Sequence, residues 1–175
     1  MNYAHSNRMD KPVARYLLFV VFIVYMFLLS EYILLARVHT SPENYVSLKH
    51  IKASIDKGKR NANLKPFETI KLMYYGKHIS TDMQYKNLGG NLFGFAPLGI
   101  LLPLLFRRLR SLLPVIAVVF AISLAYELMQ LCTGLGIFDV DDLILNTSGG
   151  IIGFIVHFCA TLFYRQPQNK TGVQL

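Results

Sequence analysis

The sequence has few charged residues, two cysteines and no tryptophan. Charged residues make up 16% of its 175 residues, and acidic residues are the scarcer sign, with 10 Asp and Glu against 18 Lys and Arg. Soluble domains carry about 25% charged residues, so this composition argues against a soluble, a disordered or a fibrous protein. Cys132 and Cys159 both lie in apolar surroundings, and they form neither a disulfide framework nor a zinc-binding pattern.

Apolar residues dominate instead: they make up 53% of the chain, and its mean hydropathy is +0.39. They gather in four runs, at residues 16–36, 88–106, 111–133 and 142–164. Each run is long enough to cross a hydrocarbon layer of about 30 Å, and open strands would find no hydrogen-bond partners there. The first run is too long for a signal peptide and lacks a small-residue cleavage site. We therefore predict an all-α integral membrane protein with four transmembrane helices, forming one domain over residues 1–175.

The basic residues indicate how the helices are oriented. A net charge of +8 beside apolar runs is typical of topology signals or contacts with anionic lipid, so we expect membrane lipids and not nucleic acid as partners. The short loop after the second run carries Arg107, Arg108 and Arg110, whereas residues 134–141 carry no Lys or Arg. This contrast predicts that both termini are cytoplasmic. The long loop, residues 37–87, disagrees with ten Lys and Arg against four acids, but we give the two short loops more weight.

The long loop contains signals for two helices. Residues 41–43, Ser-Pro-Glu, look like a helix start, with proline in the first turn. Pro66 precedes apolar residues spaced by three and four, which form one face of a short helix: Phe67, Ile70, Met73 and Tyr74. This basic amphipathic segment either lies in the membrane interface or covers the end of the helix bundle.

Five polar residues are expected at one depth in the membrane. Four helix ends face the same side of the membrane: the end of the first run, the start of the second, the end of the third and the start of the fourth. Each of them carries polar residues, and Glu31 lies at the end of the first run. At 1.5 Å per residue, Glu127 lies roughly 9 Å inside that surface, with Ser123 one turn before it on the same face. The residues that can converge there are Asn91, Glu127, Gln130, Asp142 and Asn146. Under the predicted topology this cluster opens to the outer face.

Three interpretations of the cluster stay open. The first is a hydrogen-bonded network that fixes helix pairing. The second is a pocket for a polar head group, with basic loop residues such as Lys57, Lys59 and Arg60 attracting anionic groups. The third is a metal site, in which acidic residues bind Mg²⁺ and through it a phosphate or diphosphate: Asp139, Asp141 and Asp142. Asp139 is alternatively a helix cap.

Small residues and missing motifs complete the sequence evidence. The pairs Gly90 with Gly94 and Gly149 with Gly153 allow close helix packing, as does a stripe that runs from Asn146 to His157. The chain has no G-x-S-x-G nucleophile turn and no phosphate-binding loop of glycines. We therefore favour a protein that is not an enzyme and expect no cofactor, with Mg²⁺ as the alternative. A homo-oligomer is compatible with the small size, although no residue argues for it.

Four blocks in order resemble the VanZ-like family of bacterial membrane proteins. They are NLKPFETI (63–70), NLFGFAPLGILLP (91–103), SLAYELMQ (123–130) and FDVDDLILNTSGGIIG (138–153). The resemblance implies a multi-pass helical bundle in the bacterial inner, or cytoplasmic, membrane. It also implies a link to resistance against teicoplanin, a lipoglycopeptide, because the founding members of the family have that link.

The resemblance carries recurring polar positions onto the same five residues of the cluster. Many members have an Arg in the loop after the third helix, where this chain has Gly134, Leu135 and Gly136. A loop lysine or a ligand cation would take its place here. The leading hypothesis is a protein that binds or handles an envelope lipid, a lipid-linked envelope precursor or a lipoglycopeptide. The alternatives are a metal-assisted enzyme acting on a lipid phosphate, and a structural membrane subunit.

Overall fold

The computed structural model describes residues 11–35, 61–75 and 88–164, together with residues 53, 55, 56 and 59. The elements in these ranges are helical, as predicted: α1 (Lys11–Ser30), the π-helical turn η1 (Glu31–Leu35), α3 (Glu68–Tyr75), α5 (Gly90–Leu105), the short 3₁₀ turn η4 (Arg107–Leu109), α6 (Leu112–Thr133) and α7 (Val140–Tyr164). The described residues contain no strand, apart from one isolated parallel bridge between Asn63 and Asp139.

Three of the four predicted spans are long enough to cross a membrane by length and composition. These are Pro12–Leu34, Leu112–Thr133 and Val140–Phe163. The predicted second span, 88–106, is helical as α5, but α5 has 16 residues and contains Pro97 and Pro103. Sixteen residues reach about 24 Å at 1.5 Å per residue, short of the ~30 Å hydrocarbon layer. The fourth crossing therefore stays a prediction.

The element boundaries differ from the predicted ones mainly at helix starts. α1 begins five residues before the expected position 16, because Pro12 suits the first turn of a helix. α7 begins at Val140, two residues before the expected position 142, with Asp139 just before it. α6 ends at Thr133 as predicted, and Gly134 follows it with a left-handed φ of 72°, which suits glycine just after a helix.

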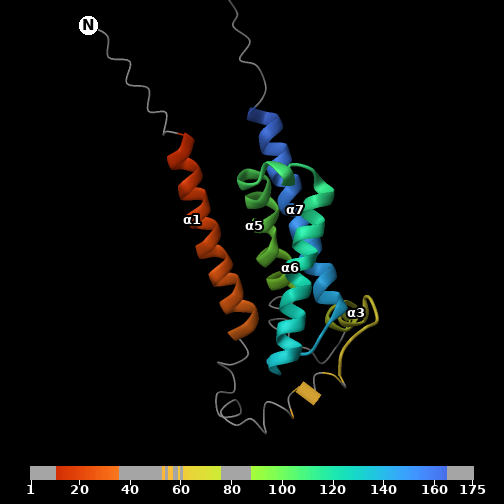
Figure 1. Ribbon diagram of the computed structural model, residues 1–175. Coiled ribbons are helices and arrows are strands. Elements are labelled where there is room, and N and C mark those ends of the chain that lie inside the picture. The colour runs from red at the N-terminus through yellow and green to blue at the C-terminus, as the bar shows by residue number, and fades with distance from the viewer. Residues whose placement is uncertain are drawn as a thin grey trace, which may run out of the picture.

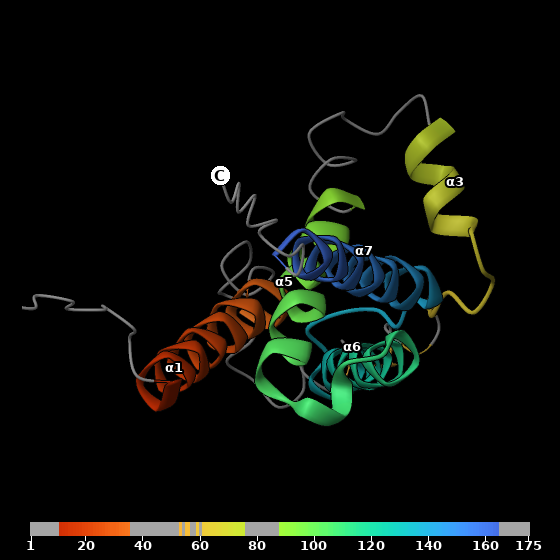
Figure 2. The ribbon, with the colours of Figure 1, turned by 90° about the horizontal axis from the view of Figure 1, so that it is seen from above.

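The helices pack around α5 and α7, which lie side by side (Figures 1 and 2). α6 packs against α7, α1 reaches α5 near the C-terminal end of α1, and α3 lies on the side of α7 away from α1 (Figure 2). The buried apolar core comprises Leu29, Phe95, Leu98, Leu102, Val115, Val119, Tyr126 and Phe154. The end of α1, the start of α5, the end of α6 and the start of α7 all lie at one end of the bundle (Figure 1).

Glycines let α5 and α7 approach closely. A Cβ at Gly149 or Gly153 would overlap a backbone carbonyl oxygen of α5, and a Cβ at Gly99 would overlap the Gly150 carbonyl oxygen. This confirms the packing role predicted for the glycines of α7. Gly94 differs from them, since a Cβ there would meet only Leu29 Cδ1, at 3.7 Å.

Candidate functional site

The predicted polar residues of α6 share one buried face. Ser123, Glu127 and Gln130 are 0%, 3% and 5% exposed, as their spacing of four and three residues predicts. Asn146 of α7 is 4% exposed. Buried polar groups are costly unless they find partners, so the contacts of each side chain decide what the cluster can do.

Two contacts join α7 to its neighbours. Asn91 at the start of α5 donates from Nδ2 to Oδ1 of Asp142, at 2.5 Å. One turn further into α7, Asn146 donates from Nδ2 to the hydroxyl of Ser123 on α6, at 2.8 Å. The structure thus brings Asn91 and Asp142 into direct contact and ties Asn146 to the polar face of α6.

The other two predicted residues reach different partners. The Glu127 carboxylate accepts a hydrogen bond from the backbone N–H of Asp139, at 2.9 Å. Gln130 donates from Nε2 to the carbonyl oxygen of Ile33 in η1, at 2.9 Å. Glu127 therefore holds the turn between α6 and α7, and Gln130 holds the end of the first helix.

Asp139 caps α7 and also binds the long loop. Its Oδ1 accepts the backbone N–H of Asp141 at 2.8 Å, which confirms the helix-cap interpretation. The same carboxylate accepts a hydrogen bond from Asn63 Nδ2 at 2.9 Å and one from the Thr69 hydroxyl at 2.6 Å. Backbone bonds reinforce this contact, from Asn63 N–H to the Phe138 carbonyl (2.9 Å) and from Val140 N–H to the Asn63 carbonyl (3.0 Å).

Asp141 caps a second helix from across the fold. Its side chain is fully buried and accepts the backbone N–H groups of Phe67, at 2.5 Å, and Ile70, at 3.0 Å. These N–H groups belong to the start of α3, where helical N–H groups have no partner within the helix. Phe67 has a φ of 67°, an uncommon left-handed conformation for a bulky residue. Residues 63–70 are thus fastened to the start of α7.

Sequence reasoning missed this attachment. The family resemblance singles out the block NLKPFETI, and the acids at 139 and 141 suit a metal site or a helix cap, but neither signal indicates a contact between the two segments. Within the ranges the structure describes, no group of three or more His, Cys, Asp and Glu side chains is placed to hold a metal ion. The oxygens of Asp139 and Asp141 accept N–H and O–H groups, so neutral donors contact the atoms that the metal-site interpretation gives to Mg²⁺.

The amphipathic segment after Pro66 is helical, and its predicted apolar face is divided between two environments. Ile70 and Met73 are half-buried, whereas Phe67 and Tyr74 are exposed by 51% and 73%. The helix start expected at residues 41–43 lies outside the described residues. So do Lys57 and Arg60, while Lys59 is described as a single exposed residue.

Two buried polar atoms in the first half of α7 have no hydrogen-bond partner among the described residues. They are Oδ1 of Asn146 and the hydroxyl oxygen of Thr147. Asn146 uses its Nδ2 for Ser123, so its Oδ1 still offers an acceptor. A buried acceptor of this kind favours a donor from outside the helices.

Comparisons with known proteins agree with the architecture. The family model described as VanZ/LLP1 matches residues 14–163. The chain is similar to a curated protein from Enterococcus faecium named Protein VanZ, with 31% identity over 94 residues. The match covers 54% of this chain and 50% of that protein, so the chain spans about half the length of the curated relative it matches. No solved structure matches the chain.

Proposed function

The chain belongs to the VanZ/LLP1 family, and we propose that this member binds the polar head group of an envelope lipid or lipid-linked precursor. The head group lies at the polar end of the bundle, against Asn91, Glu127, Gln130, Asp142 and Asn146. The observation that carries the proposal is the buried Oδ1 of Asn146, which has no partner among the described residues. A network that served helix pairing alone would use both ends of this amide.

The side chains of the cluster favour a head group that donates hydrogen bonds. The acceptor that the cluster offers is the buried amide oxygen of Asn146, while the Glu127 and Asp142 carboxylates accept hydrogen bonds within the protein. Hydroxyl and ammonium groups bind such acceptors, so sugar or amino head groups fit better than a bare phosphate. In this proposal Glu127 sets specificity or takes up a proton.

The proposal includes a topology. The helices cross the inner membrane four times, both termini are cytoplasmic, and the polar end faces outward. The turn after α5 carries three arginines, whereas the loop 134–141 carries no Lys or Arg. This contrast supports the orientation, because basic residues collect in cytoplasmic loops. α3 then lies in the outer interface, where exposed aromatic side chains of this helix and of the residue before it fit the region of the head groups: Phe67, Tyr74 and Tyr75.

A lipid-binding role at the outer face fits a contribution to resistance against lipoglycopeptides such as teicoplanin. The role is tested in a strain that lacks the protein and is complemented with variants. Susceptibility is scored together with the abundance of each variant in the membrane.

Asn146→Ala and Ser123→Ala form a matched pair for this test. Both remove the bond between Asn146 Nδ2 and the Ser123 hydroxyl, but only Asn146→Ala removes the buried Oδ1. If Oδ1 holds a head group, Asn146→Ala behaves like the deletion at normal abundance, and Ser123→Ala behaves nearly like the wild type. Equal effects of the two variants, or loss of both from the membrane, would contradict the proposal.

The equal-effects outcome would favour a structural subunit. That alternative has its own support, because Asn91, Glu127, Gln130 and Asn146 each bridge two segments of the chain. Interhelical hydrogen bonds in membranes contribute about 0.6 kcal/mol each on average. For the metal-assisted enzyme, the described residues provide no comparable support.

A further inference from the structure

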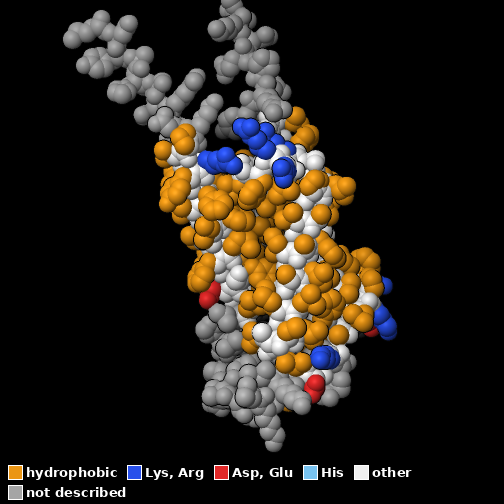
Figure 3. Space-filling model, in the orientation of Figure 1, with side chains coloured by type: hydrophobic (Ala, Val, Ile, Leu, Met, Phe, Trp, Pro, Cys, Tyr) orange, Lys and Arg blue, Asp and Glu red, His pale blue; other side chains and the backbone are white. Residues whose placement is uncertain are grey.

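The end of the bundle opposite the polar cluster carries a concentration of positive charge. Arg15 lies near the start of α1, Arg107 and Arg108 form most of η4, and Arg110 follows η4. Figure 3 shows Lys and Arg side chains gathered at this end of the molecule. Among the described helices, every carboxylate belongs to the other end or to α3: Glu31, Glu68, Glu127, Asp141 and Asp142. No carboxylate of these helices is therefore placed to neutralise the arginines.

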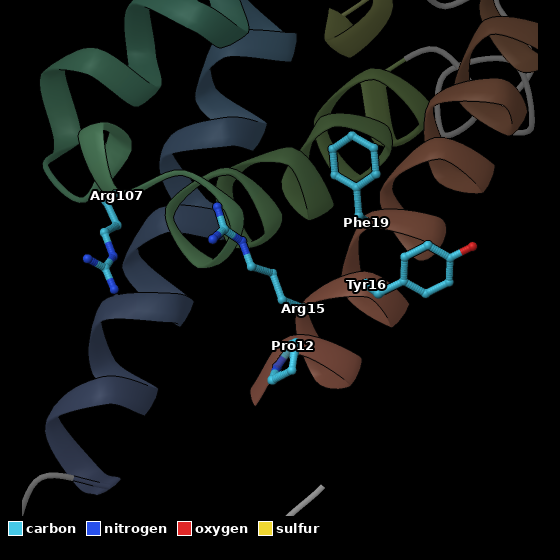
Figure 4. A pocket seen from close by; sticks show the side chains of 5 residues that line it. All are labelled: Pro12, Arg15, Tyr16, Phe19 and Arg107. Atoms are coloured by element: carbon cyan, nitrogen blue, oxygen red, sulfur yellow. The ribbon is translucent and has the colours of Figure 1, made fainter. Parts of the chain in front are cut away.

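A pocket opens between two of these arginines. It is an open pocket of about 520 Å³, and the residues that line it are Pro12, Arg15, Tyr16, Phe19 and Arg107. In Figure 4, Arg15 extends from α1 towards α5, and Arg107 lies across from it on the turn after α5. The remaining lining is aromatic and apolar, so the pocket combines two guanidinium groups with a wall that suits hydrocarbon.

The pocket exists because α1 is attached to the bundle near its other end. The Tyr25 hydroxyl donates to the Gly94 carbonyl at 2.6 Å, and Ser30 and Tyr126 share a hydrogen bond of 2.7 Å. The rings of Phe22 and Phe106, 6.3 Å apart, form an edge contact nearer the arginine end. Beyond that contact α1 diverges from α5 (Figure 1).

We propose that this pocket binds the phosphodiester group of an anionic phospholipid, with an acyl chain along the exposed apolar side of α1. Guanidinium groups bind phosphate through paired, charge-assisted hydrogen bonds. Tyr16 and Phe19 lie within about one turn of Arg15, where aromatic rings suit the level of the head groups. A topology signal requires only that positive charges lie on this side of the membrane. It does not explain why Arg15 and Arg107, which come from separate elements, line the same pocket. Under the proposed topology, this lipid belongs to the inner leaflet.

The test measures how many phospholipids the purified full-length protein retains in detergent. Phosphatidylglycerol is compared with phosphatidylcholine by native mass spectrometry, for the wild type, Arg107→Gln and Arg108→Gln. Arg108 is the matched control, because it lies in the same turn and is exposed, but it does not line the pocket. Arg15→Gln tests the second guanidinium group, and the thermal midpoint of each variant reports on folding.

A direct hydrogen bond from an arginine to the phosphate and a general attraction of positive charge for anionic lipid predict different losses of lipid retention. Losing a charge near a membrane surface weakens attraction to anionic lipid about fivefold, whereas losing a hydrogen bond to a charged group costs more than about tenfold. We expect Arg107→Gln and Arg15→Gln each to lower phosphatidylglycerol retention by more than about tenfold, and Arg108→Gln by about fivefold or less. Equal losses in all three variants, or equal retention of the two lipids by the wild type, would overturn the proposal.

The source of the phosphate is tested in the same samples. Inorganic phosphate should not displace bound phosphatidylglycerol, because the acyl chain supplies contacts that the free ion lacks. Displacement would show that the pocket takes a soluble phosphate, and the lipid proposal would be wrong. The result is independent of the polar cluster, which lies at the other end of the bundle.

Discussion

At the scale of single residues, Glu127 is the side chain whose charge is least expected. It is 3% exposed within an apolar helix, and its carboxylate accepts the N–H of Asp139. Charged groups at such depth are costly and usually serve a function. Its role therefore depends on whether the charge or only the acceptor oxygen matters.

Glu127→Gln separates these two properties. The amide oxygen of glutamine can still accept the Asp139 N–H, so we expect membrane abundance and thermal midpoint to stay near the wild type. If the charge serves head-group binding, the variant fails to complement the deletion strain. Full complementation would show that the hydrogen bond alone is needed. Abundance by immunoblot is the control that separates loss of function from loss of protein.

The glycines of the α5–α7 contact allow a sharp comparison at the same scale. A Cβ at Gly153 would overlap the Ala96 carbonyl oxygen, whereas one at Gly94 would meet Leu29 Cδ1 at an ordinary 3.7 Å. Overpacking costs about 1–3 kcal/mol. We expect Gly153→Ala to lower the thermal midpoint in detergent clearly and Gly94→Ala to leave it nearly unchanged. Equal midpoints would contradict the packing.

At the scale of elements, two carboxylates attach α3 to the start of α7, and the buried one, that of Asp141, holds the backbone of α3. Asp141 accepts both the Phe67 and the Ile70 N–H, and each hydrogen bond to a charged group contributes about 1.5–3 kcal/mol. Asparagine has one acceptor oxygen, so Asp141→Asn cannot satisfy both donors equally. We expect amide hydrogen exchange of Phe67 and Ile70 to accelerate by more than about tenfold.

Glu68→Gln is the control for this measurement. Glu68 lies in the same segment, its side chain is 59% exposed, and it pairs with Lys65 at 4.0 Å. An exposed pair of this kind contributes little. Exchange at Phe67 and Ile70 should therefore stay at the wild-type rate. Comparable acceleration in both variants would mean that the segment responds to any loss of charge.

Hydrophobic patterning predicted most of these elements, but not how the loop attaches. The four apolar runs and the short helix after Pro66 follow from local sequence, and the spacing of Ser123, Glu127 and Gln130 placed them on one buried face. The bonds from residues 63–70 to the start of α7 join positions about 75 apart in the chain. Hydrophobic periodicity describes neighbouring residues only, so it cannot reveal a contact between such distant positions. Without that contact, the acids that cap two helices, Asp139 and Asp141, look like metal ligands in the sequence.

At the scale of the whole molecule, two native cysteines report the orientation. Cys132 and Cys159 are both exposed. Cys132 lies one residue before the end of α6, at the polar end of the bundle, and Cys159 lies in α7 towards the arginine end. With both termini cytoplasmic, a membrane-impermeant maleimide should label Cys132 in intact cells and leave Cys159 unmodified.

Cys132→Ser provides the control, because it should abolish the labelling of intact cells. Labelling of Cys132 only after the cells are opened would place the polar end in the cytoplasm. The head-group proposal would then have to concern the inner leaflet, and the phospholipid proposal the outer one.

The uneven packing of the helices has a consequence for biosynthesis. α1 leaves the ribosome first, and the window that defines its span is 6% buried, so α1 can remain in the bilayer before its neighbours exist. α5 is short, contains two prolines and buries seven residues, many against α7, which is translated some 50 residues later. α5 therefore depends on a partner that has not yet been made. The contact that buries this face of α5 can therefore form only late in translation, once α7 has left the ribosome.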